Sequence, residues 1–152
     1  MLRDFLLASA HHLLAFGLVA MIVTQSVLLS RELDAATLRR LAGVDRGLGI
    51  VATLLLVVGL ARVFHGLKGS DFYLHNPWFH AKFGAYLAAA LLSLVPTVRL
   101  VRWRKAARAD PAWRPPAQQA ARLRRIVRVE LLLIAVILVA AAGMARHGGL
   151  HL

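Results

Sequence analysis

Histidines and other cations gather in one short connection of this chain, residues 62–83, which lies between two long apolar segments and is rich in aromatic residues. A further pair, His11 and His12, lies inside the first apolar segment. The chain has no cysteine, which excludes disulfides, thiolate metal sites and thiol catalysis. Imidazole, amine and carboxylate groups are therefore the ones left for any chemistry.

His11 and His12 are candidate functional residues because an ionisable side chain inside an apolar membrane segment is costly unless it finds a partner. Successive residues lie about 100° apart around a helix, so the two rings cannot both face the axis of a bundle. His12 shares its helix face with the small Ala8, whereas His11 shares its face with Leu7. We therefore expect His12 to face inward. The alternative is that both histidines bond neighbouring groups and hold helices together.

His80 and Lys82 lie in the first turns expected for a later apolar segment, at a depth similar to that of His12. They are about 200° apart around a helix, so one of them faces the bundle core. Placing an ammonium group in the apolar core is costly. An anionic ligand, a carboxylate, or deprotonation with metal ligation would reduce this cost. The ammonium group can also extend to the lipid head groups. Both residues stay open as candidates.

Neutral nitrogen ligands on two helices, with small residues beside one and aromatic residues beside the other, suit a haem iron inside a four-helix bundle. We therefore expect haem b as the cofactor. The candidate iron ligands are His12, His80 and Lys82, and His11 is a further candidate cofactor-binding residue. Arg62 and Lys68 stand where they would pair with the haem propionates.

The haem hypothesis predicts an electron-transfer protein or oxidoreductase with quinone or porphyrin as its redox partner. Whether the protein is an enzyme stays open. A second interpretation is a periplasm-facing copper or zinc protein. Its ligands would come from His65, His75, His80, His147 and His151. A third is an accessory subunit without a cofactor, in a homo-oligomer or a larger membrane complex.

The elements that position these residues are membrane-spanning helices. The chain is 59% hydrophobic and has repeated uncharged runs, with a mean hydropathy of +0.66. Runs of about 17 residues or more are long enough to cross a bilayer. We expect an all-α, integral membrane four-helix bundle, a single domain over residues 1–152 surrounded by membrane lipids. The expected spans are about 5–29, 47–64, 77–101 and 126–145.

The distribution of charge predicts the orientation. The formal net charge of +12 comes from cations placed between apolar runs, which argues against nucleic-acid binding because no soluble basic domain remains. Loops rich in Lys and Arg stay in the cytoplasm. Residues 30–46 and 99–128 are such stretches, so we expect a bacterial inner-membrane protein with both termini in the periplasm. All seven histidines then lie toward the periplasmic side.

Several short motifs together resemble the bacterial membrane family known as domain of unknown function 2214. They are His11-His12, Gly66-x-Lys68-Gly69, Asn76-Pro77 with Lys82, and Arg102-Trp103-Arg104. The resemblance covers all four expected spans. It implies a membrane protein and names no activity.

The chain is also similar in layout to the J-type protoporphyrinogen oxidases, four-helix membrane haem proteins with a histidine in the first span and a Leu-His-x-Lys motif in a later one. His12 and Phe79-His80-Ala81-Lys82 occupy comparable places. The tryptophan that this family carries in its first span is absent here. The resemblance implies a b-type haem site at the outer side of the bundle, with His12 and either Lys82 or His80 as axial ligands.

Overall fold

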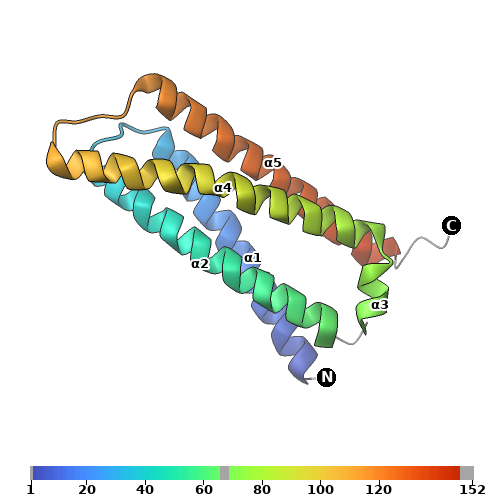
Figure 1. Ribbon diagram of the computed structural model, residues 1–152. Helices are drawn as coiled ribbons and strands as arrows, with labels where there is room; N and C mark the ends of the chain where they lie inside the picture. Colours follow the sequence, from blue (N-terminus) through green and yellow to red (C-terminus); the bar gives the residue numbers. More distant parts are fainter. Residues whose placement is uncertain (1, 66–68, 148–152) are drawn as a thin grey trace.

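The computed structural model describes residues 2–65 and 69–147, and this part of the chain is built from helices joined by short connections (Figure 1). The helices are α1 (Leu2–Leu29), α2 (Ala35–His65), α3 (Gly69–Leu74), α4 (Pro77–Ala109) and α5 (Ala117–His147). By length and composition, α1, α2, α4 and α5 can each cross a membrane. The expected all-α membrane four-helix bundle is confirmed.

The four long helices form two antiparallel pairs, α1 with α2 and α4 with α5 (Figure 1). The pairs associate through α2 against α4 and α1 against α5, so each long helix packs against two other long helices. We call the end with the connections 30–34 and 110–116 the basic end. The other end, with the start of α1, the end of α2, α3, the start of α4 and the end of α5, is the histidine end.

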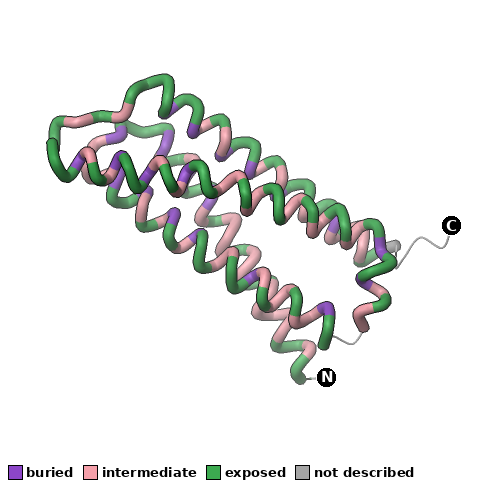
Figure 2. Tube along the Cα trace, in the orientation of Figure 1, coloured by how far each residue is buried: buried purple, intermediate pink, exposed green. Residues whose placement is uncertain are grey.

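Buried side chains are concentrated toward the basic end (Figure 2). The most buried large residues there come from all four long helices: Leu29, Leu38, Leu41, Leu100, Leu123 and Val127. Trp103 of α4 packs into the same cluster. The helices are therefore packed together mainly in this half of the bundle. Packing is looser at the histidine end, where a cleft lies between the helices.

The helix α2 begins well before the span expected at 47–64, because charged residues interrupt an apolar pattern without ending a helix. Asp34 caps its first turn: the Thr37 backbone N–H donates to the Asp34 carboxylate at 2.7 Å, and the Leu38 N–H donates to the Asp34 carbonyl at 2.9 Å. Such a cap satisfies a backbone donor that has no partner within the helix. The Thr37 hydrogen bonds also lower the pKa of Asp34, which keeps the cap ionised.

The start of α4 matches its sequence signal. Asn76 is the N-cap and its side-chain oxygen accepts from the Trp78 N–H at 2.9 Å, while Pro77 takes the first helical position. Proline suits this position because its missing N–H would have no partner there. Asp110 caps the far end, one residue before Pro111. The Asn76 cap therefore fixes the residue at which α4 begins.

Replacing Asn76 with alanine should destabilise the protein by about 0.5–2 kcal/mol, because the N-cap acceptor is lost. Asn76 is fully buried, so solvent cannot substitute for it. Thermal unfolding in detergent, followed by circular dichroism, measures the change. Asn76→Ser keeps an oxygen acceptor and should lose less stability. Equal melting temperatures for Asn76→Ala and the unmodified protein would contradict the capping role.

Candidate ligand-binding cleft

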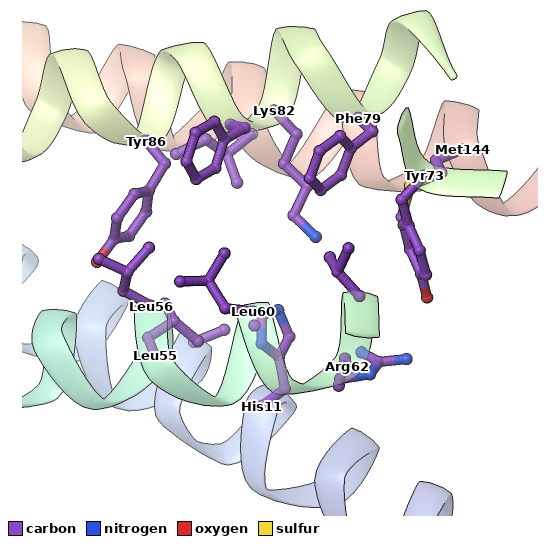
Figure 3. A pocket seen from close by; sticks show the side chains of 15 residues that line it. His11, Leu55, Leu56, Leu60, Arg62, Tyr73, Phe79, Lys82, Tyr86 and Met144 are labelled. Carbon is purple, nitrogen blue, oxygen red and sulfur yellow. The ribbon is translucent and has the colours of Figure 1, made fainter. Parts of the chain in front are cut away.

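A cleft opens at the histidine end between the long helices, with Tyr73 of α3 at its edge (Figure 3). Water-sized molecules can occupy about 120 Å³ within it, and the cleft is open to the outside of the bundle. Its walls are mainly apolar or aromatic, with Leu55, Leu60, Phe79, Phe83, Tyr86 and Met144 among them. Small-molecule sites are typically lined in this way, by apolar walls with a few polar groups.

His11 of α1 points into this cleft (Figure 3). Its ring lies against Gly59 of α2, where an added Cβ would be 3.5 Å from the His11 Cε1. The His11 Nδ1 is buried and has no hydrogen-bond partner among the described residues. Buried polar atoms are normally paired, so this unpaired nitrogen beside the cleft is unusual.

His12 lies on the exposed side of α1, where its Nδ1 donates to the Ala8 carbonyl at 2.6 Å. The expectation that His12 faces inward is therefore wrong. The rotation of α1 is set by its buried residues Ile22, Gln25 and Leu29. Continuing their spacing of three and four residues toward the N-terminus leads to His11. The packing of these buried residues therefore turns His11, and not His12, toward the cleft.

Lys82 extends from α4 into the cleft toward His11 (Figure 3). His80 is exposed instead, and its Nε2 donates to the Leu74 carbonyl at 2.8 Å. The structure thus chooses Lys82 over His80 as the residue that faces the cleft. The His11 ring of α1 and the Lys82 amine of α4 therefore lie on opposite sides of the cleft.

The cleft is positively charged. Arg62 of α2 and Lys82 line it, both are close enough to act electrostatically on His11, and the described residues that line it include no acid. The Arg62 Nε is buried and without a hydrogen-bond partner among the residues described. These cations can hold an anionic group at the edge of an apolar cavity. The residues present therefore have the chemistry that a haem with propionates requires.

The remaining candidates are not gathered in one place by the described structure. Lys68 and His151 lie outside the described residues. His75 bonds its own helix turn, with its Nδ1 3.0 Å from the Asp71 carbonyl and 3.1 Å from the Asp71 carboxylate. Within residues 2–65 and 69–147, no three His, Asp or Glu side chains form a group that could hold a metal ion. The copper or zinc interpretation with His65 and His75 stays a prediction.

Comparison with known proteins identifies a family rather than an activity. No curated protein and no solved structure matches the chain. One family model, described as "Predicted membrane protein (DUF2214)", matches residues 3–149, which is nearly the whole sequence. The chain therefore belongs to this family of predicted membrane proteins.

Proposed function

We propose that this membrane protein binds haem b in the cleft and transfers electrons, with quinone or porphyrin as its redox partner. The supporting observation is the buried, unpartnered Nδ1 of His11 in an apolar cleft, with Lys82 directed toward it from the opposite helix pair. In this proposal His11 and Lys82 are the iron ligands. An imidazole and an amine are both nitrogen donors that suit haem iron, and the Lys82 ammonium would release its proton on binding the iron.

The other residues of the cleft would hold and shield the ligand. Arg62 would pair with a propionate, and Phe79 and Phe83 would pack against the porphyrin plane. Bound haem would supply one-electron exchange, at a potential that depends on its nitrogen ligands and its apolar surroundings. The cleft would keep water from most of that surface.

The proposed orientation places the basic end in the cytoplasm of a bacterial cell and the cleft at the periplasmic side of the inner membrane. It rests on the cations that flank the two connections at the basic end, including Arg39 and Arg40 on α2 and Arg102 and Lys105 on α4. Positive loops are retained in the cytoplasm. The haem would then exchange electrons near the periplasmic surface.

Haem titration of the purified full chain in detergent tests the proposal. We expect a shifted Soret band that saturates at one haem per chain, with sharpened visible bands after reduction. A titration that shows only free haem would overturn it. Copper or zinc found in the purified protein without porphyrin would favour the metal alternative, and neither cofactor would favour an accessory subunit.

A further inference from the structure

A second polar cluster lies inside the bundle toward the basic end. Hydrogen bonds join Gln25 of α1, Asp45 of α2 and Thr97 of α4, and Glu130 of α5 is close enough to Asp45 to interact with it electrostatically. The Asp45 Oδ1 accepts hydrogen bonds from the Gln25 Nε2 and the Thr97 Oγ1, both at 3.2 Å. None of the four lines the cleft that holds His11, so this is a separate site.

Glu130 is the most unusual member of the cluster. Only 1% of its surface is exposed, and neither carboxylate oxygen has a hydrogen-bond partner among the described residues. The Gln25 side chain is fully buried, and its Oε1 is likewise unpartnered in the described part of the chain. An ionised carboxylate in such surroundings costs several kcal/mol unless a positive charge compensates it. Glu130 must therefore either be compensated by a nearby positive charge or carry a proton.

The neighbouring arginines Arg99 and Arg124 do not pair with Glu130, because both bond other groups. Asp45 is the charged side chain that acts electrostatically on Glu130, and it is also an acid. Arg99 of α4 donates to the Gln119 side chain at 3.4 Å, and Arg124 of α5 donates to the Leu29 carbonyl at 3.1 Å. Gln25 of α1 and Thr97 of α4 are uncharged. The two acids thus share one buried cluster in which no base from the described part of the chain pairs with them.

We propose that Glu130 and Asp45 form a proton-binding site, in which Glu130 carries the proton at neutral pH and Asp45 is its ionised neighbour. Two carboxyl groups in a low-dielectric site are not both ionised, so they hold a proton between them. Gln25 and Thr97 donate hydrogen bonds to Asp45, which stabilise its negative charge. Glu130 accepts none from the residues that the structure describes, so it is the member that retains the proton.

The inference does not depend on haem binding, because it concerns other residues and another part of the bundle. Infrared spectroscopy of the full chain in detergent detects the carbonyl stretch of a protonated carboxyl group directly. We expect this band at neutral pH, and we expect Glu130→Gln to remove it. Glu32→Gln is the control because the Glu32 side chain is 83% exposed and should ionise normally. That variant should leave the neutral-pH band unchanged.

A second variant keeps the test valid if Glu130→Gln does not fold. Asp45→Asn retains Glu130 but removes the neighbouring negative charge, so the band should disappear at a lower pH than in the unmodified protein. No protonated carboxyl band at neutral pH would overturn the proposal, and so would a band that persists in a folded Glu130→Gln variant. Loss of the band on adding sodium or magnesium at constant pH would show that the site binds a metal ion instead.

Discussion

Replacing His11 with alanine is expected to weaken haem binding by on the order of 100-fold or more, whereas replacing His12 should leave it nearly unchanged. The Nδ1 of His11 is buried in the cleft without a partner, while His12 is exposed and bonded to the Ala8 carbonyl. Loss of residues that merely orient metal ligands already costs 10–100-fold in metal affinity. Loss of a ligand should cost at least that much.

Haem titration followed by the Soret band measures both affinities, with His12→Ala as the matched control one residue away. Adding free imidazole to His11→Ala should restore part of the bound spectrum, because the substitution leaves space beside Gly59 for the missing ring. A merely structural role of His11 would show no such rescue. Equal losses in the two variants, or loss in His12→Ala alone, would contradict the assignment of His11 as the ligand.

Replacing Gly143 with alanine is expected to destabilise the bundle by about 1–3 kcal/mol, the usual cost of overpacking. A Cβ at Gly143 of α5 would lie 2.7 Å from the Cδ2 of Trp78 and 2.8 Å from its Cε3. The contacted atoms belong to a rigid indole ring, so either the ring or α5 must move. Gly143 is thus required where α5 passes the first turn of α4.

Thermal unfolding in detergent checks this prediction. Gly49→Ala is the matched control, since it also lies within a long helix but its added Cβ would meet nothing within 4 Å. Gly49→Ala should be neutral or slightly stabilising, because alanine is the better helix former. Combining Gly143→Ala with Trp78→Leu should recover part of the loss, since the two positions are in contact. Equal melting temperatures for Gly143→Ala and Gly49→Ala would contradict the steric argument.

The sequence by itself determined the elements of this protein. Long uncharged runs can cross a membrane only as helices, because the bilayer offers no partners for the backbone polar groups. The Asn76-Pro77 pair marked the start of α4 to the residue, since an N-cap acceptor followed by proline is a local signal. The overall class and family follow from such features, which depend on neighbouring residues alone.

Only the tertiary structure decided which side chains face one another. A span that is apolar on all sides does not indicate its inward face, so the rotation of α1 that places His11 rather than His12 in the cleft came from packing against α2 and α5. Helix packing likewise places Lys82, rather than His80, in the cleft. In the sequence Glu130 is a single acid among arginines, and nothing local links it to Asp45, which is 85 residues away. Helix packing alone brings the two acids together.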